Sequence, residues 1–337
     1  MTRLWLAVTQ QLSLTPTSGT TLDGYDAEAV GRELGALEPI PTSDGSFSLQ
    51  SGAFGEAFHN SAGALNEAKS KFVRPSELNA WSTPGALRVL DVCFGLGYNS
   101  AALWDADSAV GLSMQWWGLE LDQRPLQLAL NHEGFCRLWS PSTRERLQAI
   151  ERTGTWSDHS GKGCVLWGDA RQTLASIPST QQFDLIFHDA FSPQRCPQLW
   201  SEEFLGQLSD RLAPAGRLLT YSRSAAVRAS LQRAGLLLRS LLPAPGEREG
   251  WSSGTMAVKP PWPRSKQVEG EGWRCFSPLE QAHLLTRAAI PFRDPSGHAD
   301  ASDILRRRVQ EQQTCDLETT NSWQRRFGLM KPKRAMP

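Results

Sequence analysis

The chain has 337 residues, 40% of them hydrophobic, with 35 basic and 35 acidic side chains. This length allows one large domain or two modest ones. Zero net charge excludes a global field that would attract nucleic acid, so any RNA contact must come from a local patch. The six cysteines form no Cys-x-x-Cys pair, which argues against a metal site or a disulfide framework and for reduced thiols in a cytoplasmic protein. The apolar run at 4–8 is too short for a signal peptide or a membrane span.

The first 80 residues read as an N-terminal segment of strands and a helix that packs on a larger core. Residues 1–22 are rich in Thr, Ser and Gln and suggest a weakly ordered arm or edge strand. Alternation at 46–50 predicts a strand, and the apolar spacing at 63–73 predicts a helix.

Residues 81–260 show a different sequence pattern, in which short apolar strands alternate with helices. We expect strands at 86–92, 113–121, 163–170, 183–191 and 216–222, each followed by a helix. Residues 236–259 read as a closing hairpin, and 137–162 as a polar insertion. Such alternation predicts an α/β, mostly parallel, doubly wound Rossmann-like sheet with an antiparallel final strand. A linker at 260–265 then leads into a C-terminal extension, 261–337, partly helical with a mobile tail.

The turn after the first of these strands, "DVCFGLGYNS" at 91–100, has two glycines one residue apart. In open parallel sheets, ligands bind beyond the carboxyl ends of the strands. Gly95 and Gly97 would let the backbone approach a nucleotide, with the next helix directing its N–H groups the same way. A tight turn that binds no ligand is the alternative.

Acidic residues end the next two strands. Glu120 lies 23 residues after Gly97, where a carboxylate would accept hydrogen bonds from ribose hydroxyls, unless it is a solvated strand-end acid. Asp169 is placed to meet an adenine amino group or, alternatively, to cap the following helix. Ser100 replaces the third glycine of the dinucleotide pattern, so no pyrophosphate cradle forms. This favours S-adenosyl-L-methionine (SAM) over NAD.

Asp189 ends the fourth strand and is followed by Phe191, Ser192 and Pro193. An acid and an aromatic ring at this strand end suggest alkylation of a nitrogen. An alkylamine has a pKa near ~10 in water, so it needs an acceptor for its protons before its lone pair can attack. Phe191 would border a splayed base. The alternatives are an Asx turn for Asp189 and core packing for Phe191 and His188.

The stretch from 189 to 235 resembles the methyltransferase domain of the tRNA 5-methylaminomethyl-2-thiouridine biosynthesis family. The resemblance rests on the motif Asp189–Pro193, on Pro197 to Trp200, on Glu202 and Glu203, and on the glycine turn with its phenylalanine. It extends upstream to the segment 55–68 and covers about 45–259. Cys93 departs from the pattern, because it stands where such turns usually have a first glycine.

The resemblance implies a class I SAM-dependent methyltransferase that N-methylates the 5-aminomethyl group of the wobble uridine in a tRNA anticodon loop. Asp189 would be the catalytic residue, and Phe191 and Glu67 would contact the substrate; the alternative for Glu67 is a solvated helix charge. The residues implied to hold SAM are Asp91, Phe94, Gly95, Gly97, Asn99, Glu120 and Asp169. Because no second glycine fingerprint follows residue 260, the flavin-dependent oxidoreductase activity of the bifunctional members is not expected.

Two basic regions are candidates for phosphate contacts. The first contains Arg217, Arg223, Arg228, Arg233 and Arg239, and the second contains 306–308 and 331–334. A small-molecule amine methyltransferase, an aminopropyltransferase and a non-catalytic RNA-binding module remain alternatives, and the oligomeric state is left open.

Overall fold

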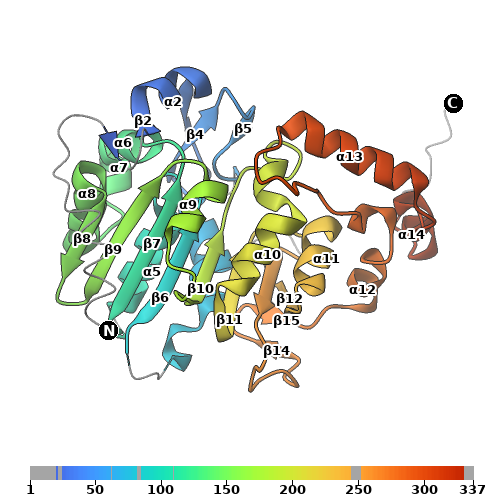
Figure 1. Ribbon diagram of the computed structural model, residues 1–337. Helices are drawn as coiled ribbons and strands as arrows, with labels where there is room; N and C mark the ends of the chain where they lie inside the picture. Colours follow the sequence, from blue (N-terminus) through green and yellow to red (C-terminus); the bar gives the residue numbers. More distant parts are fainter. Residues whose placement is uncertain are drawn as a thin grey trace, which may run out of the picture.

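The computed structural model describes residues 20–21, 25–61, 63–81, 85–108, 110–243 and 252–329. Most of the arm expected at 1–22, and the tail from 330 with its basic residues, lie outside this range. A ten-stranded sheet runs through the molecule, and helices cover both of its faces (Figure 1). Its strands, in spatial order, are β14 (Glu269–Gly270), β15 (Trp273–Arg274), β12 (Leu237–Leu241), β13 (Gly254–Val258), β11 (Leu212–Thr220), β10 (Phe183–His188), β6 (Leu87–Val92), β7 (Met114–Glu120), β9 (Gly161–Trp167) and β8 (Thr155–Asp158).

The five central strands, from β11 to β9, pair in parallel. β13 lies antiparallel between β11 and β12, while β8 and β15 add antiparallel strands toward the two edges. This arrangement confirms the predicted doubly wound sheet with its antiparallel closing hairpin. Since parallel strands point the same way, the segments after β6, β7, β9 and β10 all meet at one edge.

Burial on both faces explains why these strands are apolar throughout instead of alternating. In β10, Leu185 and Phe187 enter one core, and Ile186 enters the other. The helices of the first core are α5 (Tyr98–Asp107), α6 (Arg124–Leu130), α7 (Glu133–Cys136) and α8 (Pro141–Thr153). Those of the second are α9 (Ala170–Ser176), α10 (Glu202–Asp210) and α11 (Ala225–Arg233), which cover the face turned to the viewer in Figure 1. A short 3-10 helix, η3 (Pro197–Trp200), precedes α10.

Residues 25–57, the first part of the N-terminal segment, lie over the carboxyl edge of the sheet, at the top of Figure 1. The strand and helix predicted here are present as β4 and as the run from α3 to η1. Its elements are β1 (Thr20–Thr21), β2 (Tyr25–Asp26), α2 (Ala27–Leu34), β3 (Leu37–Pro41), β4 (Phe47–Ser51), β5 (Glu56–Ala57), α3 (Ala64–Glu67), the π-helix η1 (Ala68–Val73), α4 (Arg74–Ser76) and the 3-10 helix η2 (Leu78–Ala80). η1 packs against α5, and the Phe72 ring contacts Phe187 of β10 at 5.4 Å between centroids.

The polar insertion predicted at 137–162 contains the helix α8 and the strand β8. Ser140 caps α8 through a bond from the Thr143 amide, and Pro141 begins the helix. Only a narrow side of α8, which includes Leu147 and Ile150, is buried, so the sequence looks polar.

The chain after residue 260 continues the main sheet. Trp262, in the expected linker, is buried against Trp273 of β15, with ring centroids 5.3 Å apart, and β15 pairs with β12. The expected linker thus joins β13 to β14 and contributes the buried Trp262 to the core. The remaining elements of the extension are α12 (Pro278–His283), η4 (Arg287–Ala289), α13 (Ala301–Thr314) and α14 (Thr320–Arg326). The division at residue 260 stays a prediction.

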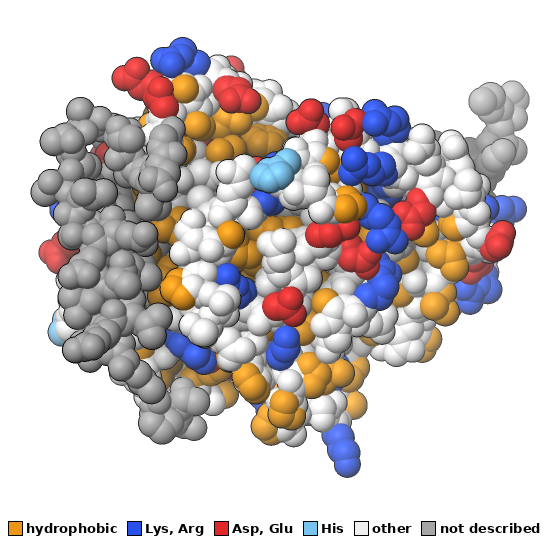
Figure 2. Space-filling view, in the orientation of Figure 1, with side chains coloured by type: hydrophobic (Ala, Val, Ile, Leu, Met, Phe, Trp, Pro, Cys, Tyr) orange, Lys and Arg blue, Asp and Glu red, His pale blue; other side chains and the backbone are white. Residues whose placement is uncertain are grey.

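The first basic region is mostly structural. Arg217, Arg228 and Arg239 are buried, and the first two pair with Glu77 at 2.8 Å and with Glu280 at 3.2 Å. On the surface near α13, basic and acidic side chains lie side by side (Figure 2). Arg306, for example, pairs with Asp303 at 2.8 Å. Sequence spacing could not reveal Glu77 and Glu280 as partners, since they come from distant elements, whereas Asp303 lies three residues before Arg306 in the same helix. No helix among the described ranges is both long and apolar enough to cross a bilayer.

Candidate active site

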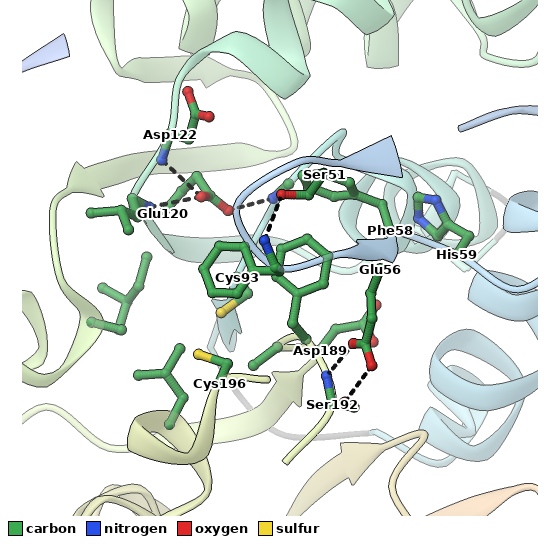
Figure 3. Close-up of a pocket in the computed structure, with 18 of the residues that line it drawn as sticks. Ser51, Glu56, Phe58, His59, Cys93, Glu120, Asp122, Asp189, Ser192 and Cys196 are labelled. Atoms are coloured by element: carbon green, nitrogen blue, oxygen red, sulfur yellow. Dashed lines mark hydrogen bonds between the residues drawn. The ribbon is translucent and has the colours of Figure 1, made fainter. Parts of the chain in front are cut away.

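A cavity of about 520 Å³ opens at the carboxyl edge of the sheet. Its floor is formed by the segments that follow β6, β7, β9 and β10, and the N-terminal hairpin β4–β5 covers it (Figure 3). This volume lies within the range of small-molecule sites, ~300–1,000 Å³. Of the sequence-predicted residues, six line the cavity, namely Glu67, Gly95, Glu120, Asp169, Asp189 and Phe191.

In the turn after β6, every second residue from Cys93 to Gly97 has a left-handed backbone conformation. Cys93, Gly95 and Gly97 have φ of +67°, +55° and +91°. Cys93 therefore occupies a glycine-favouring backbone position and lines the cavity, where burial raises the pKa of its thiol. Gly97 does not line the cavity; a Cβ there would come within 2.9 Å of the Phe94 ring, so this glycine serves packing.

The Glu120 carboxylate is held by backbone amides at the end of β7. Its Oε2 accepts a bond from Gly95 N–H at 2.7 Å, and its Oε1 accepts bonds from the Leu121 and Asp122 amides at 2.7 and 2.9 Å. Burial nevertheless raises its pKa to about 7. Glu120 thus ties the glycine turn to the neighbouring strand end and faces the cavity from there (Figure 3).

Asp169 has the capping role that the sequence left open. Its Oδ1 accepts the Arg171 amide at 2.9 Å at the start of α9, and it pairs with the Arg171 guanidinium at 2.6 Å. Arg171 Nη1 also donates to Asp294 Oδ2 at 2.7 Å and to Ala299 O at 3.1 Å. Asp294 is 1% exposed. The C-terminal extension therefore braces this wall of the cavity. The local sequence pattern did not predict this contact.

This brace leads to a prediction for Asp294→Asn. Without the charge, Arg171 and Asp169 are held less firmly, and we expect SAM to bind about fivefold more weakly, the equivalent of ~1 kcal/mol for one hydrogen bond. Calorimetric titration with SAM measures this. Asp300→Asn is the matched control, since Asp300 is exposed and its side chain makes no capping bond to α13. Equal affinities for both variants would contradict the brace.

Asp189 follows β10 and lies in the same cavity as Gly95 and Glu120. Its Oδ2 accepts a bond from Asn99 Nδ2 at 2.7 Å. Burial, together with the negative charge of Glu67, raises the pKa of Asp189 to about 8, against the lowering effect of the Asn99 bond. Asn99 is thus a positioning residue for Asp189 and does not itself line the cavity.

Two other sequence-predicted residues, Asp91 and Phe94, do not line the cavity. Asp91 is fully buried and accepts the Ser100 hydroxyl at 2.6 Å, and burial raises its pKa to about 7. Phe94 packs edge-on against Trp116 at 5.2 Å. His188 is buried, and its Nε2 lies 2.9 Å from Leu199 O, in agreement with a packing role.

An aromatic cluster closes the Asp189 side. Phe191 stacks on Phe54 of the hairpin at 4.3 Å and meets Phe58 edge-on at 4.9 Å. Glu56 fastens the hairpin to the loop after β10, because it accepts the Ser192 amide at 3.0 Å and the Ser192 hydroxyl at 2.5 Å (Figure 3). The sequence did not single out Phe54, Phe58 or Glu56, although all three lie in the upstream segment or beside it.

A buried ion pair lines the cavity below the hairpin. Lys71 Nζ lies 2.5 Å from Glu67 Oε1, and Glu67 Oε2 accepts the Asn60 amide at 3.2 Å. Both side chains are buried, and Lys71 holds the pKa of Glu67 below its usual range despite the burial. Within the described ranges, no group of three or more His, Cys, Asp and Glu side chains is placed to hold a metal ion.

Known methyltransferases resemble this chain in sequence and in structure. A family model described as S-adenosyl-L-methionine-dependent methyltransferase matches residues 146–256. The solved structure of MnmC2 from Aquifex aeolicus superposes with a TM-score of 0.68 at 26% identity, covering 93% of this chain and 96% of that one. The chain is therefore similar to this methyltransferase family in sequence and in fold.

Curated relatives agree with this placement. An uncharacterized protein of Methanocaldococcus jannaschii is 28% identical over 81% of this chain and 72% of its own length. The tRNA 5-methylaminomethyl-2-thiouridine biosynthesis bifunctional protein MnmC of Methylibium petroleiphilum is 28% identical over 73% of this chain. The chain spans 42% of that bifunctional relative and 30% of the one from Aromatoleum aromaticum, to which it is 31% identical.

The cofactor of this methyltransferase is SAM, and the cavity fits it. SAM carries a sulfonium cation, a ribose and an adenine, and it has no phosphate. The cavity likewise offers acids in place of a pyrophosphate cradle. They are Glu56, Glu67, Glu120, Asp122, Asp169 and Asp189.

Proposed function

We propose that this methyltransferase transfers the methyl group of SAM to the nitrogen of a 5-aminomethyl group on the wobble uridine of tRNA. The observation that carries the proposal is the placement of Asp189 in one cavity with Gly95, Glu120 and Phe191. The names of the bifunctional relatives and of the Aquifex structure support the RNA substrate.

Bound SAM supplies an electrophilic methyl group, which is lost from sulfur as the new carbon–nitrogen bond forms. The chain must present the amine with its lone pair free. Once it is ionised beside the sulfonium cation, the Asp189 carboxylate accepts an N–H bond and takes up the proton that the amine has to lose, and Asn99 fixes the orientation of this carboxylate. Burial also lowers the pKa of an alkylamine, which favours the neutral nucleophile. Alignment of the amine supplies much of the remaining rate.

Phe191 and Phe54 offer ring faces on the substrate side. A wobble base lies in a single-stranded loop, where it can be splayed out and stacked on an aromatic side chain. Gly95, Glu120 and Asp169 hold SAM on the opposite side. The hydrogen bonds that Ser192 donates to Glu56 keep the hairpin over both halves of the cavity.

The test uses methyl-labelled SAM and two tRNA samples that differ only at the wobble uridine, one with a 5-aminomethyl group and one unmodified. We expect label in the digested wobble nucleoside from the first sample and background from the second. Label transferred to polyamines instead would favour a small-molecule amine methyltransferase. RNA binding with no detectable SAM binding would favour the non-catalytic module.

A further inference from the structure

The cavity has an excess of acidic groups. Six carboxylates line it, against two cationic side chains, Lys71 and Arg171, among the residues that the structure describes. This excess suits a sulfonium and an amine. It does not suit the α-carboxylate of SAM, which carries a negative charge and needs a cationic or N–H donor when water is excluded.

Arg171 is already committed to other partners. Its guanidinium binds Asp169, Asp294 and the Ala299 carbonyl oxygen. Arg171 also belongs to the segment after β9, two residues from Asp169. A further anionic ligand at this guanidinium would have to compete with two carboxylates at 2.6 and 2.7 Å.

Lys71 lies toward the other end of the cavity. It precedes Phe72, whose ring packs on Phe187 of β10, two residues before Asp189. In the sheet, β7 and β6 separate β9 from β10. A SAM molecule with its adenine at Asp169 and its ribose at Glu120 would therefore extend its amino-acid end toward Asp189 and Lys71.

The pair that Lys71 forms with Glu67 matches that end of SAM in charge. Both residues line the cavity, four positions apart, and each is less than 10% exposed. Two buried charges cost desolvation energy that their mutual attraction only partly offsets. A zwitterion that brings one carboxylate and one ammonium supplies the missing charge-assisted bonds to both.

We propose that Lys71 binds the α-carboxylate of SAM and that Glu67 accepts a bond from its α-ammonium. The inference rests on the part of the proposed function that places SAM in this cavity. It assigns Glu67 to the cofactor and not to the RNA substrate, contrary to the expectation from sequence.

A consequence follows for specificity. Decarboxylated SAM, the donor that aminopropyltransferases use, keeps the sulfonium and the ammonium but lacks the carboxylate, so it is more positively charged than SAM. An acidic cavity without Lys71 would favour this ligand. Lys71 therefore makes the cavity select the methyl donor over the aminopropyl donor.

The experiment measures the dissociation constants of SAM and decarboxylated SAM by calorimetry on the full chain. We expect the wild type to prefer SAM by about tenfold or more. Lys71→Met should weaken SAM binding by about 10- to 100-fold, the range for a hydrogen bond to a charged group. Binding of decarboxylated SAM should change by less than about threefold. Lys69→Met, an exposed lysine on the same helical segment, is the control and should behave like the wild type.

Because Lys71→Met leaves the Glu67 carboxylate buried without this partner, the double variant Glu67→Gln/Lys71→Met is measured beside it. A folded double variant with the same selective loss of SAM binding supports the proposal. Equal weakening of both ligands, or no change in their ratio, overturns it. The readout needs no RNA, so a failure to methylate tRNA would sink the proposed substrate and leave this result intact.

Discussion

Asp189→Asn is expected to lower kcat by ~10² or more, the contribution of a positioned acid–base group. Asparagine keeps the shape of the side chain and can still meet Asn99, but it offers no negative charge to the amine and cannot take up its proton. SAM binding should change by no more than about threefold, because Gly95, Glu120 and Asp169 remain. Single-turnover methylation of 5-aminomethyl tRNA at saturating SAM separates the two effects.

The control for this variant is Asp210→Asn, at the exposed end of α10. It removes one carboxylate far from the cavity and should keep the wild-type kcat. If Asp189→Asn retained kcat within about fivefold of the wild type, Asp189 would have no part in proton transfer, and another group in the cavity would have to accept the amine proton.

Because the pKa of Asp189 is raised, Asp189→Asn should also change how the stability of the protein depends on pH. Below about pH 8 the native carboxyl is mostly protonated, whereas in the unfolded chain it ionises near ~4. The native state thus binds more protons than the unfolded state between these values, so Asp189 makes unfolding easier as the pH rises through this window. Asp189→Asn should therefore raise Tm at pH 8–9 more than at pH 5. A Tm difference independent of pH would show that Asp189 ionises as readily in the native state.

Ionisation also couples Asp189 to the cofactor. A sulfonium cation is stabilised by a carboxylate and not by a neutral carboxyl group. SAM affinity in the wild type should then increase from pH 6 to pH 9, and the slope should be shallower in Asp189→Asn.

The sequence predicted the acidic groups at the edge of the sheet because their positions follow from the chain itself. Each of Glu120, Asp169 and Asp189 follows an apolar run, and parallel strands bring the residues after them to one edge. The fold class and the cavity's acidic lining could thus be argued before any coordinates. The glycine turn was equally visible, although its two glycines differ: Gly95 faces the cavity, and Gly97 packs against Phe94.

Other parts of the site depend on contacts between distant segments, which spacing does not encode. Asn99 is in the turn motif but acts through Asp189, 90 residues away. Asp294 reaches Arg171 across 123 residues. Arg228 carries the same charge as an exposed arginine, yet it is buried beside Glu280. Residue type alone does not show which side chains are buried or paired, because burial depends on elements that are distant in the sequence.

Glu120→Ala is expected to weaken SAM binding by about 10- to 100-fold, the range for losing hydrogen bonds to a charged group. Two losses combine in this variant. The carboxylate proposed to bind the ribose hydroxyls is gone, and the Gly95, Leu121 and Asp122 amides lose the acceptor that orders the turn. Calorimetric titration with SAM gives the affinity, and Glu145→Ala, on the exposed side of α8, serves as the control.

Glu120→Gln separates these two losses. A glutamine has one oxygen, so it can accept from Gly95 or from the Leu121 and Asp122 amides, while its NH₂ group faces the other set. The turn would remain partly ordered, and one polar partner for the ribose would remain. We therefore expect an affinity between those of the wild type and Glu120→Ala. If glutamine bound SAM as weakly as alanine, the negative charge of Glu120 would be the decisive feature, and if both variants bound SAM like the wild type, the ribose would lie elsewhere in the cavity.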